Sequence, residues 1–235
     1  MAGAGVGTPA GLRVVRPRPV LSLAIEGASR GGAPVLGPIR LEVEEGDTVA
    51  ITGPSGVGKT TLLRVVAGFE RPRGEARVEG PVAMVFQEPT LLPWRSARDN
   101  LRITARIGAE EADRWLERVG LAGLGRRRPN AMSLGQQRRL SLARAFAARP
   151  RLLLMDEPFV SLDAPTAEAM MDLFARLRRG SGAATLLVTH AEAEAKRLAT
   201  RIVTLGGRPA TVVADRQNMG LYRHSSASGV ASSGS

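Results

Sequence analysis

Nine consecutive residues form the stretch of this chain best suited to chemistry. They match the phosphate-binding loop pattern G-x-x-x-x-G-K-[ST] at each fixed position: Gly53, Pro54, Ser55, Gly56, Val57, Gly58, Lys59, Thr60 and Thr61. Glycines let the backbone turn tightly and bring N–H groups against phosphate oxygens, and a following helix adds the partial positive charge of its N-terminus. In such a loop Lys59 reaches the β- and γ-phosphates, and the Thr60 hydroxyl holds Mg²⁺.

The use of lysine and the flanking sequence support the same interpretation. The chain has 33 Lys plus Arg residues, and only Lys59 and Lys196 are lysines. Lysine offers a compact point charge where arginine offers a planar fork. Residues 48–52 predict a short buried strand before the loop, and residues 61–67 predict the helix that leaves it.

Four further polar residues each follow an apolar run that is predicted to be a strand: Gln87, Asp156, Glu157 and His190. Sites in open α/β sheets lie at the carboxyl ends of strands. There Asp156 suits the Mg²⁺ shell, and Glu157 suits a group that orients or deprotonates an attacking water. A neutral His190 could hydrogen-bond the γ-phosphate or the water, and the Gln87 amide could contact Mg²⁺ or water. Taken singly, each also fits an ordinary solvated or core position; behind a phosphate loop they predict a hydrolytic site.

The sequence predicts both strands and helices. Strands are expected at 21–25, 39–43, 48–52, 76–78, 82–86, 152–155, 184–189 and 201–205, and helices at 61–67, 97–106, 110–119, 133–148, 165–179 and 191–199. From about residue 88 to residue 148 helical periodicity replaces the strand runs, which predicts a helical subdomain inserted into an α/β core. Residues 1–19 are expected to be a disordered segment and residues 215–235 a flexible tail, which leaves one domain at 20–214.

Composition limits the possible classes of protein. The 235 residues suffice for one α/β domain, and the absence of cysteine excludes disulfides and thiolate metal sites. No apolar run approaches about 18 residues, and residues 1–20 lack the apolar core of a secretory signal, so a cytosolic location is expected. The net charge of +11 could attract nucleic acid or an anionic membrane. The arginines are scattered, however, and 3% aromatic residues are too few for base stacking, which favours charges spread over solvated faces.

The order of these motifs resembles the ATP-binding subunit of ABC transporters over roughly residues 20–213. The motifs are the phosphate loop, Gln87, Ser133-Leu134-Gly135-Gln136-Gln137, Asp156-Glu157-Pro158, Ser161-Leu162-Asp163 and His190. The segment at 86–94, FQEPTLLPW, further resembles the nitrate/sulfonate/taurine importer branch. The resemblance implies a P-loop NTPase core with a mixed or parallel sheet, an N-terminal antiparallel β subdomain and an inserted helical subdomain. It also implies ATP and Mg²⁺ as cofactors and ATP hydrolysis coupled to transmembrane transport.

The resemblance further implies a dimer with composite sites. Ser133, Gly135 and Gln136 match the signature motif, which heads a helix and faces the γ-phosphate bound by the other subunit. Asp163 matches the loop that crosses the dimer interface. Gln87 and residues 88–94 match the region that meets the coupling helix of the membrane subunit. The expected partners are a second ATP-binding subunit, transmembrane permease subunits and, indirectly, an external solute-binding protein, with this chain at the cytoplasmic face of the membrane.

Two departures from the family pattern affect these expectations. Met132 and Leu134 replace the first and third residues of the usual Leu-Ser-Gly-Gly-Gln signature, but the residues that contact phosphate remain. Arg30 stands where the family usually stacks an aromatic residue on adenine. A guanidinium plane can also stack, so Arg30 is a predicted ATP-binding residue with weaker adenine affinity.

Two other functions fit part of the sequence. A soluble ABC-type switch protein acting on nucleic acid or ribosomes is supported by the net charge, but such proteins typically carry tandem domains or long insertions for which this chain has no room. A degenerate module would bind ATP without turnover, and the retained Lys59, Asp156, Glu157 and His190 argue against it. The cargo is left open within a branch whose substrates are small anions or organic solutes such as nitrate, sulfonate or taurine.

Overall fold

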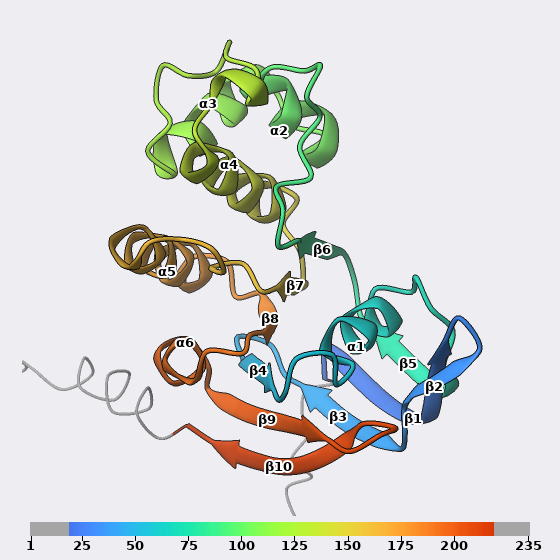
Figure 1. Cartoon of the computed structure of the whole chain (residues 1–235). Helices are drawn as coiled ribbons and strands as arrows, with labels where there is room; N and C mark the ends of the chain where they lie inside the picture. Colours follow the sequence, from blue (N-terminus) through green and yellow to red (C-terminus); the bar gives the residue numbers. More distant parts are fainter. Residues whose placement is uncertain (1–18, 219–235) are drawn as a thin grey trace, which may run out of the picture.

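The computed structural model describes residues 19–218, and Figure 1 shows them as two sheets with helices packed on both. The first sheet is antiparallel and is built around β1 (Leu21–Arg30), which pairs with β2 (Ala33–Leu36), β3 (Ile39–Val43) and β5 (Arg73–Val78). The inward side chains of β1 and β3 alternate with exposed ones, as expected for a sheet with one wet face.

The second sheet has six strands in the order β10-β9-β4-β8-β7-β6. Its parallel strands are β4 (Thr48–Thr52), β6 (Val82–Val85), β7 (Leu152–Asp156), β8 (Ala184–Val188) and β9 (Arg201–Gly206). The edge strand β10 (Thr211–Gln217) runs antiparallel to β9. Because the parallel strands share one direction, the residues that follow β4, β6, β7 and β8 all emerge at one edge of the sheet.

Three helices cover the core of the chain (Figure 1). Helix α1 (Lys59–Val66) lies between the two sheets and packs Leu62 and Leu63, both fully buried, into their shared apolar core. Helices α5 (Ala164–Arg179) and α6 (Glu192–Leu198) follow β7 and β8. Helix α1 therefore connects the end of the phosphate loop to the core shared by both sheets.

The helical subdomain consists of α2 (Ala97–Ala105), α3 (Ala109–Arg118) and α4 (Leu134–Ala147). A short 3₁₀ turn, η1 (Pro129–Ala131), precedes α4. The core of the helical subdomain is apolar, with Leu101, Leu116 and Leu140 almost completely buried.

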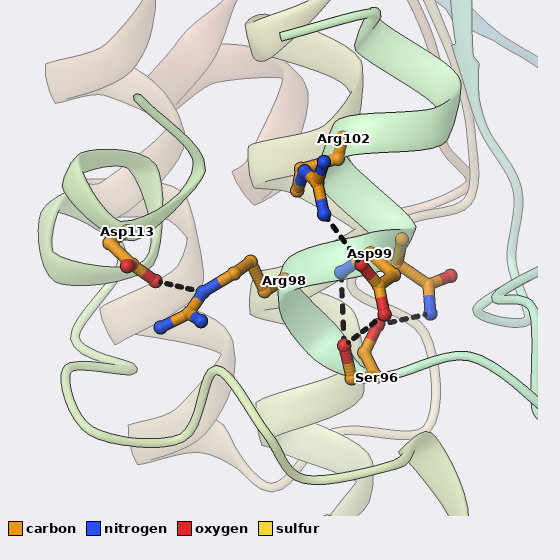
Figure 2. Close-up of polar contacts among 6 residues, drawn as sticks. Ser96, Arg98, Asp99, Arg102 and Asp113 are labelled. Atoms are coloured by element: carbon orange, nitrogen blue, oxygen red, sulfur yellow. Dashed lines mark hydrogen bonds and ion pairs between the residues drawn. The ribbon is translucent and has the colours of Figure 1, made fainter. Parts of the chain in front are cut away.

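Polar contacts fix the start of α2, as Figure 2 shows. The Ser96 hydroxyl caps the helix by accepting a hydrogen bond from the Asp99 N–H. Arg98 joins α2 to α3 through an ion pair with Asp113, with 2.7 Å between Nε and Oδ1. Arg102 pairs with Asp99 one turn earlier on α2. These contacts hold the first turn of α2 to Ser96 and to α3.

The predicted fold class is confirmed, with differences in detail. Strand β2 was not predicted, and β1 extends to Arg30. Strand β10 was also missed, and it includes residues 215–217, so the predicted start of the flexible tail at residue 215 was wrong. Residues 219–235 of the predicted tail and residues 1–18 of the predicted N-terminal segment lie outside the described residues. Within residues 19–218, no helix is both long and apolar enough to cross a bilayer.

Candidate nucleotide site

The loop after β4 requires glycine at two positions. Gly53 and Gly58 have φ values of 136° and 120°, a region that other residues rarely occupy. A Cβ on Gly53 would lie 2.4 Å from the Leu205 carbonyl oxygen, and one on Gly58 would lie 2.9 Å from Leu36 Cδ2. The antiparallel sheet, through Leu36 in β2, therefore forms one wall of the loop. Within the loop Pro54, Ser55 and Gly56 are exposed, whereas Val57 and Thr61 are buried.

Lys59 lies inside this loop. Its side chain is only 5% exposed, and Nζ donates hydrogen bonds to the carbonyl oxygens of Gly53 and Pro54, both at 2.9 Å. Lys59 is also the first residue of α1, whose N-cap, Gly58, has no side chain to bind the first N–H groups. The loop thus combines an ammonium group with helix N–H groups, an arrangement that suits an anion.

Thr60 and Asp156 meet across the sheet edge. The Thr60 hydroxyl donates a hydrogen bond of 3.1 Å to Asp156 Oδ1, at the end of β7. Burial raises the pKa of Asp156, partly offset by the bond from Thr60 and the charge of Lys59, while the charge of Glu157 raises the pKa further. Two adjacent hard oxygen donors fit Mg²⁺, which commonly takes one or two protein oxygens and completes its shell with water and phosphate.

Glu157 and His190 form the second pair at this edge. His190 Nδ1 lies 3.3 Å from Glu157 Oε2, and His190 is the more exposed of the two. The backbone of Glu157 has a φ of 45°, in the left-handed region that costs a non-glycine residue roughly 1–2 kcal/mol. A carboxylate held in an unfavourable backbone conformation beside a phosphate loop is typical of a functional position.

Two residues that the sequence did not single out hold the segment of His190. The Thr189 hydroxyl donates to Glu194 Oε2 in the first turn of α6 and accepts a hydrogen bond of 3.0 Å from the Ala191 N–H. Burial raises the pKa of the Glu194 carboxyl. The available signal was an acidic residue one helical turn after a histidine at a strand end.

Gln87 lies two residues after the end of β6, at the same edge, and is exposed. Its side chain makes none of the hydrogen bonds found within residues 19–218.

The loop that follows Gln87 is held by Asn100, which is fully buried in α2. Asn100 Oδ1 accepts from the Leu92 N–H at 2.8 Å, and Nδ2 donates to the Leu92 and Ser96 carbonyl oxygens at 3.1 and 3.0 Å. Sequence reasoning missed Asn100, because an asparagine inside a helix has no distinctive pattern.

The predicted signature residues lie at the start of α4. Ser133 is the N-cap and forms a capping box with Gln136: the Ser133 hydroxyl accepts from the Gln136 N–H, and the Gln136 side chain accepts from the Ser133 N–H. A Cβ on Gly135 would meet the Thr166 methyl group of α5 at 3.8 Å, so the beginnings of α4 and α5 lie close together. Asp163 caps α5, and the hydrogen bond from Thr166 lowers the pKa of Asp163.

Arg30 ends β1, away from the acidic residues of the sheet edge. Its Nε lies 3.8 Å from Glu70 Oε1, and the same carboxylate forms a closer pair with Arg64 of α1. The Arg30 side chain is 58% exposed, so one face of its guanidinium remains accessible. The structure thus brings Lys59, Thr60 and Asp156 to one edge with the Glu157–His190 pair, while Arg30 and the start of α4 lie elsewhere.

This geometry defines a class of protein: an α/β ATPase with a phosphate-binding loop and acidic residues at neighbouring strand ends. The family model described as "ABC transporter" matches residues 36–160. The chain is 39% identical over 202 residues to the "Aliphatic sulfonates import ATP-binding protein SsuB 1" of Pseudomonas savastanoi pv. phaseolicola, covering 83% of this chain and 84% of that protein. It is 41% identical over 202 residues to the "Taurine import ATP-binding protein TauB" of Escherichia coli K12, covering 79% of each. The chain belongs to the ABC transporter family.

Solved structures agree with this assignment. A dimeric structure of the ATP-binding cassette MJ0796, titled as a post-hydrolysis state bound to ADP and Pi, has a TM-score of 0.73 and 27% identity, and covers 85% of this chain and 99% of its own. The chain is therefore an ABC ATPase. The rival function as a soluble switch protein is not favoured.

Proposed function

We propose that this chain powers an importer of small organic sulfonates, such as taurine or aliphatic sulfonates. Two relatives that match about four-fifths of the chain are named for these imports. The observation that carries the catalytic part is the convergence of Lys59, the Thr60–Asp156 pair and the Glu157–His190 pair at one sheet edge.

In the proposed mechanism the chain's own residues position ATP and water. Lys59 and the loop N–H groups bind the β- and γ-phosphates, and Thr60 and Asp156 are the residues that would hold Mg²⁺, with Gln87 as a further ligand from the neighbouring strand end. Mg²⁺, when bound, neutralises phosphate charge. Glu157 accepts a proton from the attacking water, and His190 holds the water and the γ-phosphate in line.

A second copy completes each site in this proposal. Ser133, Gly135 and Gln136 present the N-terminus of α4 to ATP held by the partner, where the helix dipole favours the γ-phosphate. Asp163, at the adjacent start of α5, lies in the loop that crosses between the copies. Arg30 stacks on the adenine through its accessible guanidinium face.

The loop that Asn100 fixes is the proposed contact with the permease. Trp94, within this loop, is 65% exposed, which is unusual for a residue of that size. We place this surface at the cytoplasmic face of the membrane, with Gln87 linking it to the nucleotide site. A solute-binding protein on the other side of the membrane would deliver the sulfonate.

The test combines growth and purification in the source cells. Cells that carry only a Glu157→Gln chain should lose growth on taurine or alkanesulfonate as the sole sulfur source and keep normal growth on sulfate. The tagged chain should also copurify with a multi-span permease from detergent-solubilised membranes. Unchanged growth on sulfonates with nitrate uptake lost would redirect the substrate, and recovery only with ribosomes or nucleic acid would overturn the transport function.

A further inference from the structure

A groove with unbalanced charge lies where α3, α4 and α5 end. Its main chamber has a volume of about 620 Å³, and an adjoining chamber of about 270 Å³ shares Trp115, Arg118 and Arg149 with it. Trp115, Phe146 and Leu177 form an apolar floor. We call the two chambers together the arginine groove. Arg149 and Pro150 of the groove precede β7, whereas Asp156 is the last residue of β7. The groove and the nucleotide residues therefore lie at opposite ends of a five-residue strand, which is about 13 Å long.

The arginine groove is lined by more basic than acidic residues. Four arginines line the two chambers, Arg114, Arg118, Arg149 and Arg176, and the acidic lining residue is Glu111. A neighbouring groove of about 610 Å³ provides an internal comparison, because it is lined by three arginines and three acids: Arg98, Arg114, Arg126, Glu110, Asp113 and Glu117. Because Arg114 lines both grooves, the arginine groove has an excess of two or three positive charges, whereas the residues that line the neighbouring groove are balanced in charge.

Helix dipoles explain only part of this excess. Basic residues in the last turn of a helix complement its negative end, which accounts for Arg118 on α3 and Arg176 on α5. Arg149 follows α4 with a φ of 50°, a position where glycine or asparagine usually closes a helix. Its guanidinium lines both chambers and donates to Glu111 at 2.9 Å, yet the side chain is 79% exposed.

Trp115 and Arg118 give the groove a preformed surface. Arg118 Cζ lies 4.8 Å from the centroid of the Trp115 ring, so the guanidinium lies over the indole within cation–π distance. A site with an apolar floor and a few convergent polar groups, and with a volume of a few hundred Å³, is typical of small-molecule binding. Guanidinium groups bind sulfonate, phosphate and carboxylate oxygens through paired hydrogen bonds.

We propose that the arginine groove binds a small organic anion, with the anionic head on Arg118, Arg149 and Arg176 and the apolar body on Trp115 and Leu177. Residues 1–18 and 219–235 contain no Asp or Glu, so no acidic side chain of these segments supplies this anion. The inference goes beyond ATP hydrolysis and transport, and it stands whether or not the imported solute is a sulfonate.

Binding can be measured by the fluorescence of Trp115 in a Trp94→Phe background, because the chain has only these two tryptophans. The probe is hexane-1-sulfonate, and hexan-1-ol and hexyltrimethylammonium are its neutral and cationic counterparts. We expect a saturable change with the sulfonate and none with the counterparts. Arg118→Gln combined with Arg149→Gln should weaken binding by about tenfold or more, the value of one or two charge-assisted hydrogen bonds.

The controls separate binding from folding. Arg126→Gln, in the charge-balanced groove, should leave the affinity unchanged, and Arg176→Gln removes one groove charge from a different helix in case the double variant does not fold. The proposal would be overturned if the Arg118, Arg149 and Arg176 variants bound hexane-1-sulfonate as tightly as the chain without these substitutions. It would also be overturned if hexan-1-ol bound as tightly as hexane-1-sulfonate. Binding to phosphatidylglycerol vesicles without binding of hexane-1-sulfonate would also overturn it, because the groove would then serve a membrane surface. ATP turnover of the same samples tests the proposed function independently.

Discussion

Replacing Asn100 with alanine tests how the loop that carries Trp94 is held. Asn100 is fully buried, and its side chain serves the Leu92 N–H as acceptor and the Leu92 and Ser96 carbonyl oxygens as donor. The variant removes these hydrogen bonds and leaves the Leu92 N–H without its partner. A hydrogen bond contributes a net 0.5–1.5 kcal/mol, and a buried group left unpaired costs about 1–3 kcal/mol, so we expect a loss of about 2–4 kcal/mol.

Calorimetry of the purified chain measures this loss directly. In a domain of this size each kcal/mol shifts Tm by about 2–4 °C, which predicts a decrease of about 4–16 °C for Asn100→Ala. The matched control is Thr104→Val, which removes a single bond to the Asn100 carbonyl oxygen and should cost about 1 kcal/mol or less. ATP affinity should stay unchanged, since Asn100 is remote from the phosphate loop in sequence and contacts, whereas copurification with the permease should fall. A loss below about 0.5 kcal/mol, within the range of ordinary surface substitutions, would refute the conclusion that Asn100 holds this loop.

Three further predictions concern charged residues. Arg138 is 7% exposed, and its Nε and Nη1 have no acceptor among residues 19–218, so Arg138→Met should raise Tm in thermal unfolding by a few degrees; a fall would show that the guanidinium is satisfied. The hydrogen bonds from Arg201 hold the pKa of Asp215 below its usual range, so Asp215→Asn should lower Tm at pH 7, and the difference should shrink as the pH falls below about 4. A difference that grows in acid would contradict that pairing. Arg30→Tyr should tighten ATP binding in a titration, and an unchanged or weaker dissociation constant would argue against stacking by Arg30.

Much of the core was predictable because its signals are local. Strands β4, β7 and β8 are buried and mostly apolar runs followed by polar residues, which is typical of parallel strands covered on both faces. The helices of the subdomain matched their predicted ranges to within one or two residues, since capping residues such as Ser133 mark their starts.

The missed strands depend on their partners more than on their own sequence. Strand β2 follows two glycines and contains Pro34, so its local signals indicate a turn, and pairing with β1 makes it a strand. Strand β10 is largely exposed and shows no clear alternation, and pairing with β9 fixes it. Local propensity cannot reveal either pairing.

The pairs within the site depend on tertiary structure in the same way. Sequence placed Asp156, Glu157 and His190 at strand ends, but the order β4-β8-β7 brings the Thr60 hydroxyl to Asp156 and His190 to Glu157. The arginine groove likewise arises from three helix ends that meet only in the folded chain. Each pair therefore becomes visible only once the order of the strands is known.

The measurement that tests the central claim most directly compares ATP binding, turnover and dimerisation of the wild-type chain and Glu157→Gln. If Glu157 acts on the attacking water, the variant should bind ATP with unchanged affinity, lose turnover by about 10²-fold or more, and accumulate as an ATP-bound dimer in size-exclusion chromatography with light scattering. Turnover near the wild-type rate, or loss of ATP binding together with turnover, would contradict the assignment of this sheet edge as the hydrolytic site.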